Sequence, residues 1–442
     1  MAARPTTSSA ERVAVPVPAT PVGLADIEAA RSLLEGVVRV TPIAGARALG
    51  ELTGTPVWLK CENLQRTGSF KIRGGYTRIA RLTAAEREHG VVAASAGNHA
   101  QGVALAARLL GVSATVFMPE RAALPKVDAT RGYGAVVHLR GETVDDAVAE
   151  ATAFARETGA VFVHPFDHPD IIAGQGTVGL EILEQVPDVA TVLVAAGGGG
   201  LLGGVAAAIR ARRPDVRIVG VQAAGAAAWP ASLAAGEPVA VTGMRTIADG
   251  IAVGRPGDTT FSQVSSLIDE LVTVGEDALS RALVHCLERA KMVVEPAGVA
   301  PVAALLEEPA RWPGPIVAVL SGGNVDPLVM LQVIQRGLVA ASRYLTLRVQ
   351  VPDRPGSLAS LLARVGGLGA NVTDVAHSRV SGPIPVGEVD VEISLETRGA
   401  EHCDRIVAEL EAAGDVVTVT GGGRPGTGTG PAENGRARDG RS

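Results

Sequence analysis

Residues 191–209 read TVLVAAGGGGLLGGVAAAI, and the class of fold depends on how this stretch is interpreted. It lies within an uncharged run from Val189 to Ile209, which is long enough to cross a membrane as a helix. However, that run holds six glycines, four of them consecutive, and Gln185 and Asp188 lie just before it. A buried strand, a glycine loop and the start of a helix explain it better, so we expect no membrane partner.

The same strand-then-helix pattern recurs through most of the chain. Apolar, β-branched runs alternate with alanine-rich segments of helical spacing, such as HAQGVALAARLLG and DDAVAEATAFARETG. The runs that we interpret as buried parallel strands are VVAAS (91–95), ATVFMP (114–119), AVVHL (135–139), VFVHP (161–165), TVLVAA (191–196), RIVGVQ (217–222) and IVAVLS (316–321). This alternation predicts an α/β protein with open twisted sheets, in which ligands bind beyond the carboxyl ends of the strands.

The pattern changes after Gly337. The strand YLTLRVQV (344–351) is followed by a helix, two strands, a second helix and the strand DVVTVT (415–420), an order typical of a ferredoxin-like βαββαβ unit. We therefore predict a main α/β domain over residues 23–338 and a ferredoxin-like domain over residues 343–420. The segments 1–22 and 421–442 have low-complexity compositions and are predicted to be disordered.

The overall composition argues against several classes of partner. The formal net charge is −6 and the aromatic fraction is 3%, so the chain lacks the basic field and the stacking side chains that favour nucleic-acid binding. Cys61, Cys286 and Cys403 are far apart and form no C-x-x-C pair, so neither a disulfide framework nor a thiolate zinc site is expected. The N-terminus has no apolar signal segment, and we predict a cytoplasmic protein.

Lys71 lies in an unusual setting for a lysine. In RTGSFKIRGG (66–75) it stands between Phe70 and Ile72, with glycines before and after. Most lysines are simply exposed to solvent. Here, however, the glycines suggest that another group, such as a ligand, must approach the backbone closely. A free lysine amine has a pKa of about 10.4, and a desolvated pocket lowers that value and makes the amine available for chemistry.

The glycine loop GGGGLLGG (197–204) follows a predicted strand and opens a predicted helix. Successive amides without side chains, at the positive end of a helix, are suited to hold a phosphate. A close-packed turn between strand and helix is the alternative. The loop is not a Walker motif, and a dinucleotide site is disfavoured because Gln222 stands where an acidic ribose-binding residue is expected.

Two further motifs follow predicted strands. In SAGNHAQG (95–102), Ser95 and Asn98 can hydrogen-bond a ligand and the helix start can hold a carboxylate, although ordinary capping is the alternative. We interpret His99 as structural. In LSGGNVD (320–326), Ser321 can meet a ligand at the end of a strand, or it can serve as a cap. A lysine, a phosphate cradle, an asparagine and a strand-end serine together suit pyridoxal phosphate.

In this order, RTGSFKIRGG, SAGNHAQG, GGGGLLGG, VVEPAG and LSGGNVD resemble the motifs of the threonine ammonia-lyase (threonine dehydratase) family of fold-type II pyridoxal-phosphate enzymes. The resemblance covers about residues 24 to 337 and implies the two-domain, tryptophan-synthase-β-like fold. It implies that Lys71 binds the cofactor covalently, that Phe70 packs beside the ring, and that Asn98 and Ser321 meet the ring hydroxyl and nitrogen. The residues implied for the phosphate are Gly197, Gly198, Gly199, Gly200 and Leu201, and those for the substrate are Ser95, Ala96, Gly97, Asn98 and His99.

The reaction implied by the family is a β-elimination that converts L-threonine to 2-oxobutanoate and ammonia, with slower action on L-serine. Relatives that racemise serine place a second serine base where Ala96 stands here, so racemase activity should be minor. Some relatives bind a metal through a glutamate where Gln222 stands here, so we expect no metal. The resemblance implies that Glu295, in VVEPAG, lies near the cofactor, but it assigns no role to this residue.

The C-terminal unit resembles an ACT domain, a module that senses amino acids. The turn DRPGSL (353–358) lies at its first strand–helix junction, where Gly356 leaves room for a ligand, although a plain turn is the alternative. The resemblance implies allosteric control by an amino acid, in isoleucine biosynthesis or threonine catabolism, and a homo-oligomer, either a dimer or a tetramer.

Two other functions remain open at the level of sequence. One is a synthase of the same fold, such as threonine synthase or cysteine synthase, which replaces a substituent instead of eliminating it. The other is an amino-acid sensor without catalysis, built around the C-terminal domain. The amino-acid sequences of the motifs SFKIRGG and SAGNHAQG favour the lyase.

Overall fold

The computed structural model describes residues 22–378 and 385–421. The predicted disordered segments, 1–22 and 421–442, lie outside these residues apart from one residue at the inner end of each. Val22 is buried and its backbone amide donates a hydrogen bond to Gln263 Oε1, and Gly421 is the last residue of a strand.

The larger of two parallel sheets has six strands in the order β1-β2-β10-β7-β8-β9. Their bounds are Ile43–Gly45 for β1, Val57–Lys60 for β2, Ile316–Val319 for β10, Thr191–Ala195 for β7, Arg217–Ala223 for β8 and Glu270–Val274 for β9. Only β1 runs antiparallel to its neighbour, and β7, β8 and β10 are almost wholly buried. Strands buried on both faces explain why their sequences are continuously apolar.

The smaller sheet has four parallel strands in the order β5-β4-β3-β6. These strands are β3 (Val91–Ala94), β4 (Ala114–Met118), β5 (Val136–Leu139) and β6 (Val161–Phe162). The helices of this part are α4 (Ala84–His89), α5 (Asn98–Leu110), α6 (Leu124–Gly132) and α7 (Val144–Thr158). All seven predicted strands are therefore present, and the predicted α/β architecture with two open sheets is confirmed.

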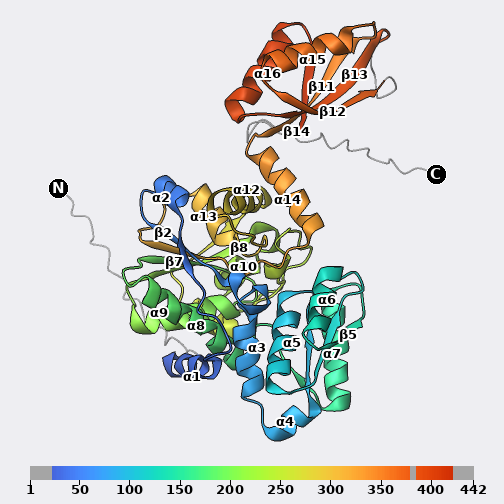
Figure 1. Cartoon of the computed structure of the whole chain (residues 1–442). Coiled ribbons are helices and arrows are strands. Elements are labelled where there is room, and N and C mark those ends of the chain that lie inside the picture. The colour runs from blue at the N-terminus through green and yellow to red at the C-terminus, as the bar shows by residue number, and fades with distance from the viewer. Residues whose placement is uncertain (1–21, 379–384, 422–442) are drawn as a thin grey trace, which may run out of the picture.

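Four helices pack together where the two sheets adjoin: α1 (Leu24–Leu34), α3 (Lys71–Ala80), α8 (Pro169–Gln185) and α9 (Gly200–Arg212) (Figure 1). Glycines let them approach closely. A Cβ at Gly204 of α9 would lie 2.4 Å from the carbonyl oxygen of Ile172 on α8, and a Cβ at Gly174 of α8 would lie 2.6 Å from that of Arg73 on α3. This tight packing fixes α3, whose first residue is Lys71.

The remaining elements of this part are helices that cover the larger sheet, connect its strands or, in the case of α14, follow its last strand along the chain. They are α2 (Arg47–Thr53), η1 (Glu62–Leu64), η2 (Arg66–Gly68), η3 (Ala224–Ala226), α10 (Ala228–Ala235), η4 (Asp249–Ile251), α11 (Asp258–Ser265), α12 (Glu276–His285), the π-helical η5 (Cys286–Ala290), α13 (Ala300–Glu307) and α14 (Pro327–Ala340). Among the described helices, none combines the length and apolar character required to span a bilayer.

The C-terminal part has the predicted βαββαβ order. It comprises β11 (Tyr344–Pro352), α15 (Ser357–Gly367), β12 (Asn371–Ser378), β13 (Glu388–Glu396), α16 (Ala400–Ala412) and β14 (Val416–Gly421). The strands form an antiparallel sheet in the order β12-β13-β11-β14, and α15 and α16 cover it (Figure 1). This arrangement is ferredoxin-like, and α14 leads into it from the larger part of the molecule.

Candidate active site

The amine of Lys71 is held in a desolvated position at the start of α3. Its Nζ donates a hydrogen bond to the carbonyl oxygen of Pro165 at 2.8 Å and lies 5.2 Å from the centroid of the Phe70 ring. Burial lowers the pKa of Lys71 to about 8, and the carboxylate of Glu295 opposes that shift. The amine is therefore far more easily deprotonated than that of an exposed lysine.

The chain before Lys71 turns sharply to bring it there. Thr67 and Gly68 both have positive φ angles, 62° and 72°, and Ser69 then pairs with Gly322 in an isolated β-bridge. The backbone amide of Phe70 donates to the carbonyl oxygen of Ser321 at 3.2 Å. The predicted lysine and the predicted strand-end serine are thus brought together, with the Ser321 side chain buried at the carboxyl end of β10.

Asn98, the first residue of α5, is held by two side chains that are distant in sequence. Its Nδ2 donates to Glu295 Oε1 at 2.7 Å, and its Oδ1 accepts from Asn324 Nδ2 at 2.8 Å. No spacing in the sequence signals this chain of three polar groups. Asn324 lies within a motif that the sequence analysis singled out, but it was given no role there.

The loop from Ser95 to His99 follows β3 and forms the start of α5. Ser95 Oγ accepts a hydrogen bond from the Gly97 amide at 3.2 Å. His99 Nε2 donates to the carbonyl oxygen of Val163 at 2.8 Å, and burial lowers the pKa of His99 to about 3. The neutral imidazole is therefore engaged with backbone. Lys126, which the sequence analysis missed, lies behind Gly97 and forms an ion pair with Asp249 at 2.9 Å.

The glycine loop joins β7 to α9. Gly199 has a φ of 96°, and no described side chain caps the helix, so its first amides remain for an anionic ligand. The loop is also tightly packed from outside: a Cβ at Gly198 would lie 2.3 Å from the Phe166 ring, and one at Gly199 would lie 2.5 Å from that of Trp229. Close packing therefore accounts for part of the glycine content, as the alternative interpretation proposed.

The cofactor suggested by the sequence fits these residues. The Lys71 amine is desolvated, the start of α9 is uncapped, and the hydroxyl of Ser69 is fully buried with no hydrogen-bond partner among the described residues. A buried polar atom without a partner is rare in proteins, and a bound cofactor would supply a partner for this hydroxyl. Within residues 22–378 and 385–421, no group of three or more His, Cys, Asp or Glu side chains is placed to hold a metal ion.

Comparisons with known proteins agree on one family. The sequence model described as "Pyridoxal-phosphate dependent enzyme" matches residues 34–322. An L-threonine ammonia-lyase of Thermotoga maritima is 47% identical over 400 residues, which covers 90% of this chain and 100% of the relative. One of Geobacter sulfurreducens is 48% identical over 394 residues, covering 89% and 98%.

Solved structures give the same result for the fold. The T.th. threonine deaminase has a TM-score of 0.66 and 42% identity, and the match covers 69% of this chain and 99% of that one. Maize serine racemase has a TM-score of 0.68 and 35% identity, with 72% and 98% covered. The predicted fold type is thereby confirmed. The chain belongs to the family of pyridoxal-phosphate-dependent enzymes, and pyridoxal phosphate is its cofactor.

Proposed function

We propose that this enzyme is an L-threonine ammonia-lyase, which converts L-threonine to 2-oxobutanoate and ammonia and acts more slowly on L-serine. The observation that carries the proposal is the desolvated Lys71 amine beside the uncapped start of α5, in a chain 47–48% identical to two L-threonine ammonia-lyases over nearly their whole length. A lyase needs a base for the α-proton and a site for the carboxylate, and these two features supply them.

Lys71 is the base in this mechanism. With a pKa of about 8, about one amine in ten is neutral at pH 7, compared with about one in 2,500 at a pKa of 10.4. Pyridoxal phosphate, when bound, supplies an electron sink for the negative charge that develops at the substrate α-carbon. Once the substrate amine has displaced the Lys71 amine, Lys71 would take the α-proton and the β-hydroxyl would leave with a proton as water. Hydrolysis of the resulting enamine, as its imine, would then release 2-oxobutanoate and ammonia.

The loop at the start of α5 would hold the substrate. Its backbone amides, with the hydroxyl of Ser95, lie at the positive end of a helix and suit a carboxylate. His99 is not the base in this proposal, because its Nε2 is occupied by Val163 and its pKa is lowered to about 3. Ala96 has no proton to exchange, which favours elimination over racemisation.

The hydroxyl of Ser321 would meet the pyridine nitrogen. A neutral hydroxyl does not keep that nitrogen protonated as a carboxylate would, so the bound ring withdraws electrons less strongly. Phe70 would pack beside the ring, and the amides of the glycine loop and of the start of α9, from Gly197 to Leu201, would hold the phosphate.

An assay for 2-oxo acid tests this function. Purified enzyme with L-threonine alone should form 2-oxobutanoate, and L-serine should give pyruvate more slowly. Because one methyl group in an apolar pocket discriminates by only about 1–3 kcal/mol, serine should not be rejected completely. Turnover of serine without threonine would contradict the substrate, and turnover only with an added second nucleophile would favour a synthase.

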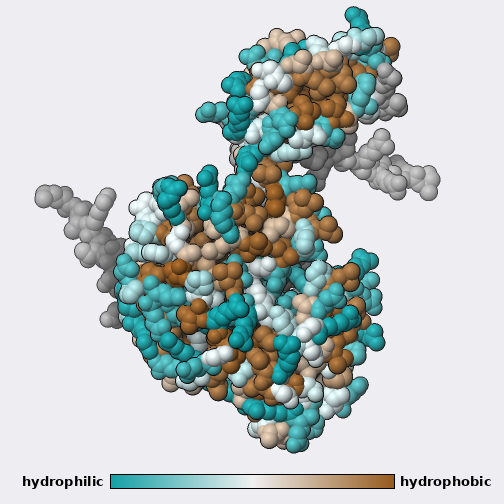
Figure 2. All heavy atoms as spheres, in the orientation of Figure 1, coloured by the Kyte–Doolittle hydropathy of each residue, from teal (hydrophilic) through white to brown (hydrophobic). Residues whose placement is uncertain are grey.

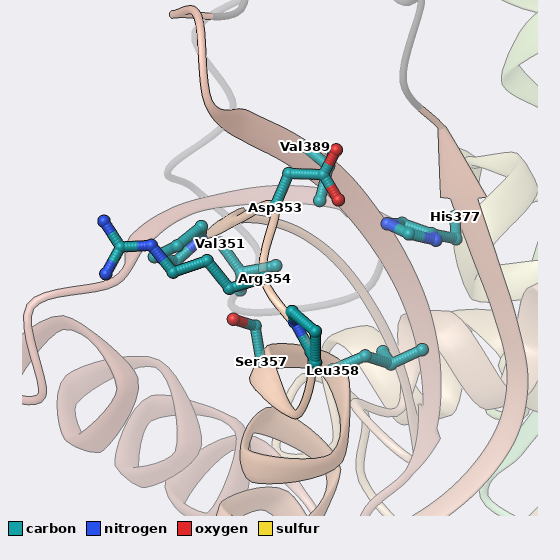
Figure 3. A pocket seen from close by; sticks show the side chains of 9 residues that line it. Val351, Asp353, Arg354, Ser357, Leu358, His377 and Val389 are labelled. Carbon is teal, nitrogen blue, oxygen red and sulfur yellow. The ribbon is translucent and has the colours of Figure 1, made fainter.

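We propose further that residues 343–420 form an ACT domain that binds an amino-acid effector. A pocket of about 370 Å³ lies at the junction between β11 and α15. Arg354 and His377 lie on opposite sides of it, with Asp353 and Ser357 between them (Figure 3). Gly356 precedes α15 with a φ of 93°, and no described side chain caps that helix, so its start could receive a carboxylate.

A homo-oligomer, either a dimer or a tetramer, is also part of this proposal. Apolar side chains lie along α14 between the two parts of the molecule (Figure 2). Leu328 and Leu331 on this helix are 72% and 54% exposed. Exposed apolar residues concentrated on one helix suggest a contact surface. Light scattering coupled to size exclusion would measure the mass, and a monomer would contradict this proposal.

A further inference from the structure

Glu295 is a buried carboxyl group at the cofactor site that the proposed mechanism does not use. It is 4% exposed, and its Oε1 accepts a hydrogen bond from Asn98 Nδ2 at 2.7 Å. On the other side of the same amide, Asn98 Oδ1 accepts from Asn324 Nδ2 at 2.8 Å, and Asn324 Nδ2 also donates to the carbonyl oxygen of Thr67. The Asn98 side chain is therefore fixed from both ends.

The backbone around Glu295 is shaped to admit its carboxyl group. A Cβ at Gly322, the residue after Ser321, would lie 2.3 Å from Glu295 Oε1. The backbone amide of Glu295 donates to the carbonyl oxygen of Gly322 at 3.0 Å, which docks the two loops on each other. A side chain at position 322 would displace the carboxyl group from Asn98, so glycine is required there for this contact.

An asparagine amide has two N–H groups and one carbonyl oxygen. In Asn98 one N–H is directed to Glu295 and the oxygen accepts from Asn324, so a single N–H remains for a ligand. Glu295 thereby fixes which edge of the amide can face the cofactor ring. If the acceptor at position 295 were lost, the amide could rotate, and the N–H would no longer be held in place.

The charges that face Glu295 come from three other elements. They are Lys71 on α3, Lys126 on α6 and Asp249 on η4. Burial raises the pKa of Glu295 to about 8, and Asp249 adds to the shift, whereas Lys126, the Asn98 hydrogen bond and Lys71 oppose it. The carboxyl group therefore gains or loses its proton close to neutral pH, and ionisation strengthens its hydrogen bond to Asn98.

We propose that Glu295 is a positioning residue of this site, which acts through Asn98 to hold the cofactor ring and whose proton makes cofactor binding depend on pH. This inference rests on the assignment of Asn98 to the ring hydroxyl, which is part of the proposed function. It does not depend on which amino acid the enzyme consumes.

A double-mutant cycle on cofactor binding tests the coupling. The dissociation constant of pyridoxal phosphate is measured for wild type, Glu295→Ala, Asn98→Ala and the double variant. We expect each single substitution to weaken binding by about tenfold, and the double variant to bind no more weakly than Asn98→Ala. If the two effects multiply, Glu295 does not act through Asn98 and the proposal fails.

Binding of pyridoxal phosphate to Glu295→Gln is the second experiment. The amide keeps an acceptor oxygen in the same place, so binding at pH 6.5 should recover to within about threefold of wild type. The wild-type dissociation constant should change between pH 6.5 and 9 through both Glu295 and Lys71, whereas the variant loses the Glu295 step. Glu308→Gln, an exposed carboxylate on the surface, is the matched control and should reproduce the wild-type profile.

These measurements also distinguish the proposal from simple misfolding and from failure of the proposed function. If Glu295→Ala does not fold, the pH profile of Glu295→Gln decides: a profile that superimposes on the wild type overturns the proposal. Neither arm requires turnover of threonine. Absence of lyase activity together with the predicted binding data would therefore refute the function and leave the role of Glu295 standing.

Discussion

At the scale of single residues, the reactivity of this site depends on where Lys71 is buried. In the proposed mechanism Lys71→Ala removes both the covalent attachment and the base, so we expect turnover of threonine to fall by at least about 10⁴-fold. Lys71→Arg is the matched control: it keeps the positive charge but remains protonated, and it should be equally inactive. Circular dichroism should show that both variants remain folded, and turnover comparable to wild type in either would refute this mechanism.

His99 gives a residue-scale prediction about stability. Its pKa is lowered to about 3 in the folded protein, because burial disfavours the charged imidazole, against an ordinary value of about 6.5. The contribution of the neutral group is complete above pH 6.5 and is lost as the pH falls from there toward 3. Over that range, His99 should reduce the free energy of unfolding by about 1.4 kcal/mol per pH unit.

Denaturant unfolding at pH 7 and pH 5.5 measures this effect. His164, whose pKa burial lowers to about 4, contributes to the same acid loss, so the comparison must be made between variants. His99→Gln keeps a donor for Val163 but cannot ionise, and it should lose about 1–2 kcal/mol less than the wild type on acidification. If the free energy of unfolding falls by the same amount in both proteins between pH 7 and pH 5.5, His99 ionises as readily in the folded state as in the unfolded state, and the prediction is wrong.

At the scale of elements, a buried network of charges joins β2, η1, α3 and α8 behind the cofactor site. Lys60 Nζ pairs with Glu181 Oε2 at 2.5 Å, and Arg73 Nη1 pairs with Glu181 Oε1 at 2.6 Å. Arg73 Nη2 also pairs with Glu62 Oε1 at 2.8 Å. Arg73 is two residues from Lys71 on the same helix, so the network fixes the helix that carries Lys71.

Removal of one carboxylate from this network should be strongly destabilising. Glu181→Gln leaves two buried cations with one carboxylate, and we expect the free energy of unfolding to fall by about 3–5 kcal/mol. Glu184→Gln is the control on the same helix: its ion pair with Arg31 is exposed, so the loss should be less than about 1 kcal/mol. Equal effects of the two substitutions in denaturant unfolding would contradict the proposed importance of burial.

The elements also show what the sequence could and could not predict. Continuous apolar runs signalled β3 and β7 because both strands are buried on each face, and the motifs that follow them are local. In contrast, Glu295 is 197 residues from Asn98, and Glu181 is 121 residues from Lys60. No local period or spacing encodes such pairs. Only the tertiary fold brings Glu181 of α8 to Lys60 of β2, and Glu295, in the segment before α13, to the start of α5.

At the scale of the whole molecule, α14 is the connection between the cofactor site and the C-terminal sheet. It begins after Asp326, two residues beyond Asn324, and ends at Ala340, shortly before β11 (Figure 1). Arg336 on α14 pairs with Asp277 on α12 at 2.8 Å, and Arg343 pairs with Glu288 of η5. A movement of the C-terminal part could therefore be transmitted by one helix, α14, to the loop that contains Asn324, whose side chain donates a hydrogen bond to Asn98.

This connection leads to a prediction about regulation. If the effector in the pocket between β11 and α15 and threonine at the proposed active site each bind two conformations of the enzyme unequally, each ligand changes the apparent affinity for the other by the same factor. A coupling of about 1–3 kcal/mol corresponds to a change of about five- to 150-fold. We expect isoleucine to produce this change and valine to oppose it, as measured by threonine saturation curves at millimolar effector.

Two changes to the chain should abolish the response and leave catalysis without effector intact. Gly356→Asp places a negative charge at the uncapped start of α15, where the effector carboxylate would bind, and the positive φ of Gly356 disfavours any side chain there. Truncation after Ala340 should also remove the response while cofactor binding persists. If the wild-type curves ignore both amino acids, the C-terminal domain serves assembly or stability instead of sensing.

Gly366→Asp is the matched control for the substitution at Gly356. It adds the same charge to an exposed position of α15 where a Cβ has open space and φ is not positive, so its response should equal that of the wild type. A general effect of added charge on this helix would reduce the response of both variants, whereas a carboxylate site at the helix start is sensitive only to the change at Gly356. If Gly356→Asp and Gly366→Asp respond alike, the effector binds elsewhere than at this junction.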